Sequence, residues 1–415
     1  MPPEQSTHSL PPQNGESKPR LSLGIYNELD RLKQTTTWGP VGAEAVLASL
    51  YPTDVSLFYD DMNVLRAREE GLNYSRFLES NGVQVVQVRD TLAGLLPVDH
   101  LDHKGVRHGI VAKARHIARA YGSTIHDDVY NGRPAEDVAL ELLEADVARY
   151  GEGPALALNE ALSLAQDLPL GNAIYSRDQM NVLLDTRVVS RMAREIRKPE
   201  VALYERAYDE LLGEHSKIEL PEGETFEGGD AYIYNNTVYI GVGTRTTMGA
   251  AVAIYEQLRE KLNERDMRFA IVEDVVYKDL PPEEQQQSMH LDTFSGPIGD
   301  KQIAVCLEEA EKREVKFLGS DDEGKTIVNH TFMNFIEHLK AEGNNIYVIP
   351  KAEQYEFGCN FLMLDDQNVV LPLKTNISTN MVLEEAGKDL HFVDLYQTTR
   401  GYGAAHCITG QQRRE

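Results

Sequence analysis

Cysteine is scarce in this chain of 415 residues, which contains only Cys306, Cys359 and Cys407. No two of them form a C-x-x-C pair, so the pattern argues against a disulfide framework and against a structural zinc site. Cys306 and Cys359 lie in apolar runs and are predicted to be buried strand residues. Cys407 differs from both, because a stretch of small and flexible residues precedes it.

Long hydrophobic runs are also absent. No stretch approaches the roughly twenty apolar residues of a membrane-spanning helix, and the N-terminus is polar rather than a signal sequence. A cytoplasmic location follows as the default expectation. Residues 1–20 combine Pro, Ser, Gln and Glu without apolar periodicity, and they are predicted to be a disordered tail.

Positive charge is in short supply, because 41 lysines and arginines stand against 66 acidic residues and give a formal net charge of -25. Phosphate contacts need clusters of lysine and arginine, so neither nucleic acid nor an anionic membrane is an expected partner. The acidity would attract a small cationic substrate. The simpler interpretation is that it keeps the protein in solution.

Hydrophobic periodicity predicts a mixed α/β chain with one all-helical part. Residues 61–82 show helical spacing and end at Gly82, and the β-rich run 83–88 follows at once. Residues 95–170 consist of pieces rich in Ala, Leu and Glu that are bounded by Gly or Pro, which predicts three or four inserted helices. The predicted division is therefore 1–20, 21–94, 95–170 and 171–415.

Strands return after residue 170. The segment Tyr232–Ile240 is two short β runs about an Asn-Asn pair, which predicts a hairpin. Further helices are predicted at 247–263 and 378–386, and further strands near 269–273, 302–308, 361–365 and 368–373. No repeat of fixed period is visible. The scattered histidines of the helical part are typical of surface or helix-packing residues rather than metal ligands; they are His108, His116 and His126.

Four short motifs carry polar residues that a purely structural interpretation leaves unexplained. They are Asn172 to Asp178 (NAIYSRD), Glu227 to Asp230 (EGGD), Met289 to Asp292 (MHLD) and Arg400 to Cys407 (RGYGAAHC). In extended backbone, His290 and Asp292 would face the same side. Taken singly, each motif also fits an ordinary role, namely an ion pair, a turn, a solvated strand end or a C-terminal loop with an accidental cysteine. Together they supply a nucleophile, an acid/base and several carboxylates.

That set of side chains suits an attack on the carbon of a guanidinium group. A guanidinium is planar, cationic and a poor electrophile, so carboxylates must hold it through paired N–H contacts. Carboxylates around a thiol tend to raise its pKa, an effect that the bound cation or a charged histidine must offset. Cys407 is therefore predicted to be the nucleophile. His290 is predicted to protonate the departing ammonia and later to deprotonate the attacking water.

The order of these motifs resembles that of the arginine deiminases of the guanidino-group modifying, or pentein, superfamily. The matching patterns are N-x-x-[FY]-x-R-D, E-G-G-D, M-H-L-D-T and R-G-x-G-x-x-H-C, and the resemblance extends from about Leu23 to Thr409. It implies a five-bladed α/β propeller with pseudo-fivefold symmetry, with the catalytic residues at its centre and a helical bundle inserted after an early blade. No metal and no cofactor are expected.

The resemblance also implies roles for individual residues. Cys407 matches the nucleophile and His290 the general acid/base. Asp178 and Asp292 match the two aspartates that grip the guanidinium, and Glu227 matches the glutamate that orients the histidine. The residues implied for the α-carboxylate and α-amino end are Asn172, Arg197 and Arg245, and Asp230 and Tyr402 complete the predicted substrate-binding set.

Tyr402 is a departure from the family pattern. The second position after Arg400 is typically an arginine that helps to bind the substrate, and loss of such a charged contact costs a few kcal/mol if nothing compensates. The residues after Cys407 and the pair Phe294-Ser295 also depart from the usual pattern. The predicted catalytic residues are all present, so the departures concern the amino-acid end of the substrate.

The preferred function is hydrolysis of L-arginine to L-citrulline and ammonia through a covalent thiouronium on Cys407. An alternative is an amidinotransferase, or a hydrolase for another guanidino compound, although the E-G-G-D motif favours hydrolysis. A third is a non-catalytic binding propeller, because fold does not fix function; the joint presence of nucleophile, acid/base and carboxylates argues against it. The expected partner is a small guanidino molecule, and a homo-oligomer is left open.

Overall fold

The computed structural model describes residues 20–99, 101–121, 130, 132–168, 170–279, 281–372 and 376–415. His126 and nearly all of the predicted tail 1–20 lie outside these ranges. His108 and His116 are exposed on helix α5 (His103–Tyr121), as the sequence predicts. Within the described ranges, no helix combines the length and apolar character needed to cross a membrane.

One three-stranded motif occurs five times among the residues that the structure describes. In each motif an antiparallel pair of strands is extended by a third strand that runs parallel to one member of the pair. The motifs are β17 (Gly410–Arg414), β1 (Leu32–Thr37) and β2 (Gln84–Gln87); β3 (Met180–Leu183), β4 (Thr186–Val189) and β5 (Lys217–Ile218); β6 (Ala231–Tyr234), β7 (Thr237–Val242) and β8 (Arg268–Asp274); β9 (Ser295–Gly299), β10 (Gln302–Val305) and β13 (Asn345–Val348); and β14 (Leu362–Met363), β15 (Asn368–Leu371) and β16 (Asp389–Phe392).

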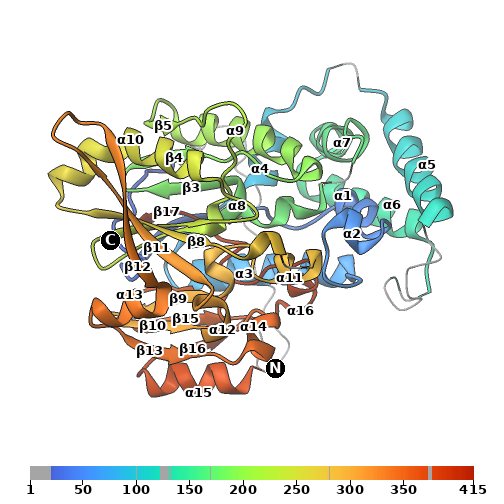
Figure 1. Cartoon of the computed structure of the whole chain (residues 1–415). Coiled ribbons are helices and arrows are strands. Elements are labelled where there is room, and N and C mark those ends of the chain that lie inside the picture. The colour runs from blue at the N-terminus through green and yellow to red at the C-terminus, as the bar shows by residue number, and fades with distance from the viewer. Residues whose placement is uncertain are drawn as a thin grey trace.

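A helix lies in the chain between the two parallel strands of every motif, as such a crossover requires. These helices are α3 (Val64–Ser80), α9 (Lys198–Leu212), α10 (Met248–Glu264), α13 (Phe335–Ala341) and α15 (Ile377–Glu385). Figure 1 shows α10 and α15 on opposite outer sides of the body that the strands form. Because β1 pairs with β17, the two ends of the described chain share one sheet.

Local sequence explains several of these elements. Asn235 and Asn236 both have positive φ, 45° and 62°, as a two-residue turn between β6 and β7 demands, so the predicted hairpin is confirmed. Thr247 caps α10 by accepting from the backbone N–H of Ala250. Gly82 ends the α3 segment with φ 81°, a conformation that favours glycine.

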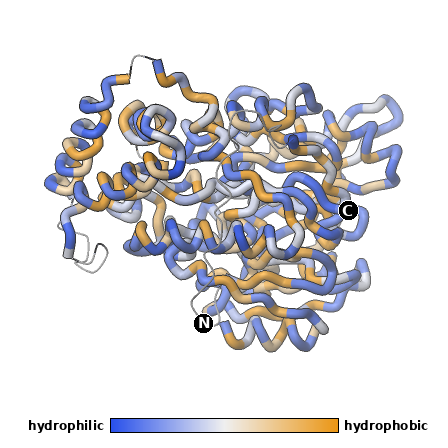
Figure 2. Tube along the Cα trace, turned by 180° about the vertical axis from the view of Figure 1, so that it is seen from behind, coloured by the Kyte–Doolittle hydropathy of each residue, from blue (hydrophilic) through white to orange (hydrophobic). Residues whose placement is uncertain are grey.

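The part between β2 and β3 consists of helices, turns and loops, without a strand, in the residues that the structure describes. Its main elements are α4 (Val88–Leu95), α5, α6 (Ala135–Tyr150), α7 (Glu152–Asn159) and a π-helical turn (Glu160–Leu164). Strand β2 ends at Gln87. Val88, which the sequence predicts to lie in a strand, is therefore the first residue of helix α4. Figure 2 shows hydrophobic and hydrophilic positions alternating along these helices, as expected for amphipathic helices that bury one face.

This helical part shares one hydrophobic core with the strands. Ile110 and Leu142 belong to the same buried cluster as Val86 and Cys407. A buried ion pair supports the junction, since Arg89 at the start of α4 lies 2.7 Å from Asp146 of α6. The helices therefore do not form a separately packed unit.

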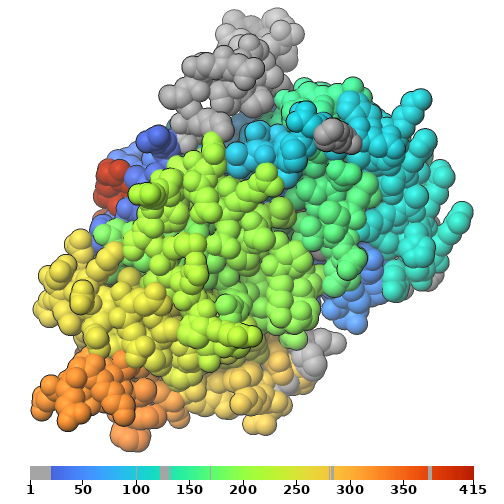
Figure 3. Space-filling view, turned by 90° about the horizontal axis from the view of Figure 1, so that it is seen from above, coloured from blue at the N-terminus to red at the C-terminus, as the bar shows by residue number. Residues whose placement is uncertain are grey.

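One hairpin has no counterpart in the other motifs and is not predicted from the sequence. It consists of β11 (Arg313–Ser320) and β12 (Thr326–Asn334), and it joins the third sheet through β11 and β8. Figure 3 shows it at the rim of the molecule. Most of its side chains are at least partly exposed, so the sequence lacks the apolar pattern of a buried strand.

Two cysteine predictions need correction. Cys306 and Cys359 are buried as expected, but neither lies in a strand. Cys306 follows β10 and accepts backbone N–H groups at the start of α12 (Leu307–Ala310). Cys359 lies in the turn between α14 (Lys351–Tyr355) and β14. The apolar sequence indicates burial at both positions, but Cys306 directly precedes a helix and Cys359 is the last residue of a turn.

Candidate active site

A short polar turn precedes the first strand of four motifs and the C-terminal strand of the fifth. Each turn contributes a side chain to one buried cluster: Asp178, Glu227, His290, Asn360 and Cys407. Asp178 lies in the turn α8 (Ser176–Gln179), and Glu227 and His290 directly precede the turns η5 (Gly228–Asp230) and η7 (Leu291–Thr293). Asn360 and Cys407 lie within three residues of the starts of β14 and β17. Equivalent places in the five motifs therefore supply the site.

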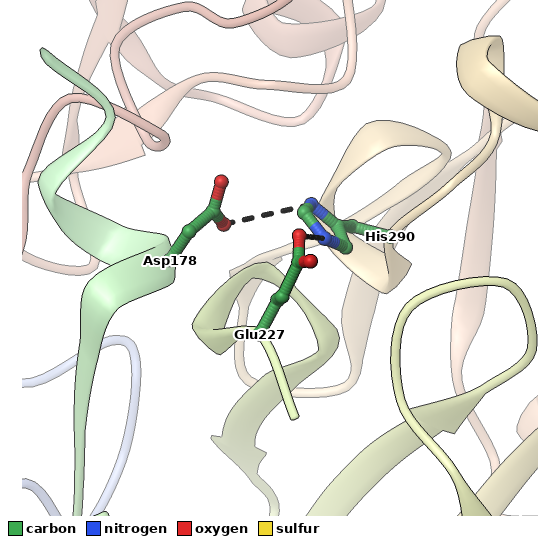
Figure 4. Close-up of side chains that lie close together, drawn as sticks. All are labelled: Asp178, Glu227 and His290. Carbon is green, nitrogen blue, oxygen red and sulfur yellow. Dashed lines mark hydrogen bonds and ion pairs between the residues drawn. The ribbon is translucent and has the colours of Figure 1, made fainter. Parts of the chain in front are cut away.

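Asp178, Glu227 and His290 point toward one another (Figure 4). His290 Nε2 lies 3.0 Å from Glu227 Oε2, and His290 Nδ1 lies 3.5 Å from Asp178 Oδ1. Donor atoms of the three residues fall within 4.8 Å of one another, close enough to hold a metal ion. Both carboxylates, however, already face the guanidinium of Arg197, whose Nη1 is 2.8 Å from Asp178 Oδ2 and 3.4 Å from Glu227 Oε2.

The charges of this cluster depend on one another. Burial acts to lower the pKa of His290, but the carboxylates of Asp178, Glu227 and Asp230 raise it to about 9. Burial acts to raise the pKa of Glu227, but Arg245, His290 and Arg197 hold it well below its usual range. The arrangement therefore favours an imidazolium beside carboxylates, which is a form that can donate a proton.

Two glycines allow these side chains to approach. A Cβ on Gly229 would lie 2.6 Å from His290 Nδ1 and 3.1 Å from Asp178 Oδ1, and a Cβ on Gly228 would lie 2.0 Å from the backbone oxygen of Arg177. The E-G-G-D motif is thus a close-packing device as well as a source of carboxylates.

Cys407 is buried, with 1% of its surface exposed. Its Sγ lies 3.8 Å from Asp292 Oδ2. Burial and the charges of Asp292 and Asp178 raise the pKa of the thiol well above its usual value. The thiol form is therefore favoured in the absence of a cation between the two aspartates.

The glycines before Cys407 have a packing role that the sequence does not reveal. A Cβ on Gly401 would lie 2.1 Å from Tyr175 Oη, and a Cβ on Gly403 would lie 2.3 Å from the Tyr175 ring and 3.0 Å from Cys407 Cβ. These glycines therefore let the loop pack closely on Tyr175.

His290 and Asp292 face different partners, contrary to the extended-strand expectation. His290 is extended, but Leu291–Thr293 form a 3-10 turn. The turn sends His290 toward Glu227 and Asp292 toward His406, where Asp292 Oδ2 lies 2.7 Å from His406 Nδ1. The two residues consequently serve opposite sides of the site.

The side chain of Asn360 holds the Cys407 loop in place, a role that the sequence analysis misses. Its Oδ1 accepts the backbone N–H groups of Ala404 and Cys407, both at 3.1 Å, and its Nδ2 donates to the backbone oxygen of Asp292 at 3.2 Å. The sequence holds a signal for it, because Asn360 directly precedes a predicted strand and Asp230 lies just before the predicted hairpin.

Replacing Asn360 with alanine is expected to lower the turnover rate about 10- to 100-fold, because two buried backbone N–H groups lose their acceptor. Steady-state kinetics measure the loss, and thermal unfolding checks that the variant folds. Asn329→Ala on β12, where the side chain is exposed, serves as the matched control and is expected to leave turnover unchanged. Equal turnover in the two variants would contradict this role for Asn360.

The structure places both predicted arginines in the same cluster, and each is paired with acids. Arg197 also lies 3.2 Å from Glu200, an acid that the sequence analysis misses; its spacing of three residues from Arg197 is the only local signal. Burial raises the pKa of Glu200 to about 7. Arg245 Nη1 lies 3.3 Å from Glu227, and its Nη2 donates to Gln286 at 2.6 Å.

The other predicted binding residues surround this cluster. Asn172, in the turn η3 (Gly171–Ile174), donates to the backbone oxygen of Ser56 at 2.7 Å, and its own backbone oxygen accepts from Arg197 at 3.3 Å. Asp230 Oδ1 accepts from the backbone N–H of Leu291 at 3.1 Å, and burial raises the pKa of Asp230 to about 7. Asp230 therefore fixes the turn that carries His290.

Tyr402 lies at the edge of the site. It has positive φ, 69°, and is partly buried. Its ring contacts Tyr59 and Phe357 edge to face, with centroids 5.4 and 6.3 Å away. An aromatic cluster thus stands where the family typically has an arginine.

Comparison with known proteins identifies the family of this chain. The sequence pattern "Arginine deiminase" matches residues 55–414. The chain is 24% identical over 422 residues to the arginine deiminase of Borreliella burgdorferi (strain ZS7), which covers 95% of this chain and 98% of that protein. It is 24% identical over 412 residues to the arginine deiminase of Mycobacterium avium (strain 104), with 94% and 97% covered.

Two solved structures illustrate the similarity of the fold. One is the DDAH of Pseudomonas aeruginosa in complex with citrulline, with TM-score 0.53, 14% identity, and 92% of this chain and 99% of that chain covered. The other is SxtG, an amidinotransferase from Microseira wollei, with TM-score 0.52, 17% identity and coverages of 95% and 97%. The likeness shows an α/β pentein fold, and the family pattern spans most of the sequence. The chain belongs to the arginine deiminase family.

Proposed function

We propose that this protein hydrolyses L-arginine to L-citrulline and ammonia through a covalent thiouronium on Cys407. The observation that carries the proposal is the placement of a buried thiol beside Asp292, with Asp178, Glu227 and His290 in the same buried site. Membership of the arginine deiminase family supports arginine as the substrate, since the relatives described above bear that name.

In this proposal the substrate guanidinium lies between Asp178 and Asp292. Asp292 Oδ1 is buried and has no hydrogen-bond partner among the described residues, so it is suited to accept a substrate N–H. Asp178 now faces Arg197, which must yield at least part of that contact when a substrate guanidinium binds. Arg197, Arg245 and Asn172 then serve the amino-acid end, with Tyr402 and Asp230 completing the pocket.

The bound cation also activates the nucleophile. Burial, together with the charges of Asp292 and Asp178, raises the pKa of the Cys407 thiol, and a guanidinium between the two aspartates would offset their charge and favour the thiolate. Binding of the correct cation and formation of the nucleophile are thereby coupled. A neutral ligand of the same shape would not produce this effect.

Chemistry then proceeds in two halves. The Cys407 thiolate forms a bond to the guanidinium carbon, and His290 gives its proton to the departing amine, which leaves as ammonia. The neutral His290 next takes a proton from water as the oxygen attacks the thiouronium carbon. The carbon–sulfur bond breaks, citrulline is released and Cys407 is regenerated. Glu227 holds the imidazole through both halves.

The finer architecture in this proposal is a five-bladed propeller with the helical part inserted between its first and second blades. The five three-stranded motifs support it, as does the convergence of the turns before their strands. The proposed ligand is a small guanidino molecule. The cytoplasmic location remains a prediction, and the oligomeric state is left open.

Direct assay tests the function. Purified protein is incubated with L-arginine, agmatine, methylated arginines and guanidino acids, and citrulline and ammonia are measured. Release of both from arginine is expected, with lower rates for the other compounds. If arginine is inert and another compound releases ammonia, the second candidate, a different guanidino hydrolase, replaces the first. Tyr402 favours that candidate, because its side chain lacks the positive charge that would attract the α-carboxylate of arginine.

Adding glycine as an acceptor distinguishes amidino transfer from hydrolysis. Formation of ornithine together with a new guanidino product would identify an amidinotransferase, the reaction class of the structurally similar SxtG.

A further inference from the structure

His406, the residue before the nucleophile, connects Asp292 to a deeper acid. His406 Nδ1 lies 2.7 Å from Asp292 Oδ2, and His406 Nε2 lies 3.1 Å from Glu28 Oε1. All three side chains are buried. Cys407 Sγ approaches the same oxygen of Asp292 at 3.8 Å. A continuous polar chain therefore runs from the thiol through Asp292 and His406 to Glu28.

Glu28 is a firm anchor for this chain. Gln411 of β17 donates to Glu28 Oε1 at 2.6 Å, and Arg414 of the same strand lies 3.3 Å from that oxygen. Arg177 of α8 approaches Glu28 Oε2 at 3.9 Å. Burial acts to raise the pKa of Glu28, but Arg414, Arg177 and His406 hold it well below its usual range. Glu28 is thus an ionised acceptor fixed from two elements.

The two oxygens of Asp292 have different surroundings. Oδ2 receives His406, whereas Oδ1 is buried and has no partner among the described residues. An aspartate side chain rotates freely about its last bond unless contacts hold it. The contact with His406 therefore decides which oxygen is left for a ligand.

We propose that His406 is a positioning residue which, anchored on Glu28, fixes the Asp292 carboxylate with Oδ1 directed at the substrate guanidinium. This inference rests on the proposed function in one respect, namely that Asp292 holds the cation. His406 itself exchanges no proton with the substrate in this account. Its role is thus separate from that of His290, which meets Glu227 and Asp178 on the other side of the site.

Two amide substitutions separate the two contacts of the ring. The amide nitrogen of asparagine falls near the position of Nδ1, so His406→Asn keeps a donor for Asp292. The amide nitrogen of glutamine falls near Nε2, so His406→Gln keeps a donor for Glu28 and loses the one for Asp292. We expect His406→Gln to lower kcat/KM for arginine about 30-fold, mostly through KM, and His406→Asn to stay within about threefold of wild type.

A second readout does not depend on turnover. Cys407 is alkylated with 2-chloroacetamidine, a cation, and with 2-chloroacetamide, its neutral analogue of the same shape, and the ratio of the two rates is measured. The cation should react faster in wild type because Asp292 and Asp178 attract it. His406→Gln should lower the ratio about tenfold, and His406→Asn should preserve it.

The outcomes separate the inference from the proposed function. If wild type hydrolyses no guanidino compound but the alkylation ratios follow this pattern, the function fails and the positioning role stands. If wild type hydrolyses arginine but both variants change the ratio equally, the positioning role is overturned. Thermal unfolding shows whether the variants fold. Should both fail to fold, Glu28→Gln decides, because an unchanged alkylation ratio in that variant would overturn the anchoring role.

Discussion

Replacing Cys407 with alanine should abolish citrulline formation, with a loss of turnover of at least about 10^4-fold, because the covalent route requires the sulfur. The fold should survive, since the change removes one sulfur atom from a loop that Asn360 holds through the backbone. Citrulline release is measured at saturating arginine, and thermal unfolding confirms the folded state.

Cys306→Ala provides the matched control for this prediction. Cys306 is as deeply buried as Cys407. It directly follows β10 in the chain, however, and lies among the apolar residues of a different core cluster. The control variant should keep near-normal turnover at a modest cost in stability. Should Cys407→Ala turn over arginine at a rate similar to that of Cys306→Ala, the covalent mechanism is wrong.

Replacing His290 with glutamine should lower turnover by about 10^2- to 10^4-fold, since glutamine can keep a hydrogen bond to Glu227 but cannot carry a proton. His108→Gln on the exposed face of α5 is the matched control and should have no effect. Near-normal turnover by His290→Gln across the pH range would remove His290 from the acid/base role.

The pH dependence of His290 has a definite sign. Its pKa is raised from 6.5 to about 9, so wild-type turnover that depends on the imidazolium should fall as pH rises through about 9. Because the pKa of His290 is higher in the folded than in the unfolded state, its protonation stabilises the fold. This stabilisation is fully present below about pH 6.5 and is lost as the pH rises through about 9. Urea unfolding of wild type and His290→Gln at pH 6 and pH 9.5 should therefore show a smaller difference at the higher pH.

The elements with strong local signals follow from the sequence. The turn at Asn235 and Asn236, helix α10 after Thr247 and the helical part between β2 and β3 all depend on contacts within a few residues. The five motifs escape a search for a fixed period because their lengths differ. The whole helical part separates the first two motifs along the chain, and the fourth holds the β11–β12 hairpin between β10 and β13, so the similarity lies in pairing rather than in spacing.

Pairing between distant segments could not be predicted. β17 joins β1 across almost the whole chain, and nothing near residues 410–414 indicates that partner. The same limitation applies to Glu28, whose contact with His406 spans 378 residues. Isolated acids of this kind have no local feature that distinguishes them from surface acids.

The candidate site was more accessible to sequence reasoning than the fold around it. Asp178, Glu227, His290, Asp292 and Cys407 were all singled out, and the structure brings their side chains into one buried region. The motifs stand out because each contains polar residues that a purely structural interpretation leaves unexplained. The direction in which each side chain of a motif points could not be predicted. In the M-H-L-D motif, a 3-10 turn at Leu291–Thr293 turns His290 and Asp292 toward different partners.

Arg197 shows why a residue type does not fix a role. Its guanidinium contacts Asp178, Glu227 and Glu200 in the absence of ligand, although the family resemblance assigns it to the amino-acid end of the substrate. Arg197 can make these contacts and also bind the amino-acid end of the substrate only if it changes partners when a substrate cation binds to Asp178.

The central claim is that Cys407 attacks the guanidinium carbon, and the covalent intermediate tests it most directly. Wild-type protein is mixed with L-arginine, quenched in acid within the first turnovers, digested and analysed by mass spectrometry. The account predicts that the peptide containing Cys407 gains the mass of arginine less ammonia, and that Cys407→Ala shows no such species. Citrulline formation in the same samples, with the Cys407 peptide unmodified at every time point, would contradict it.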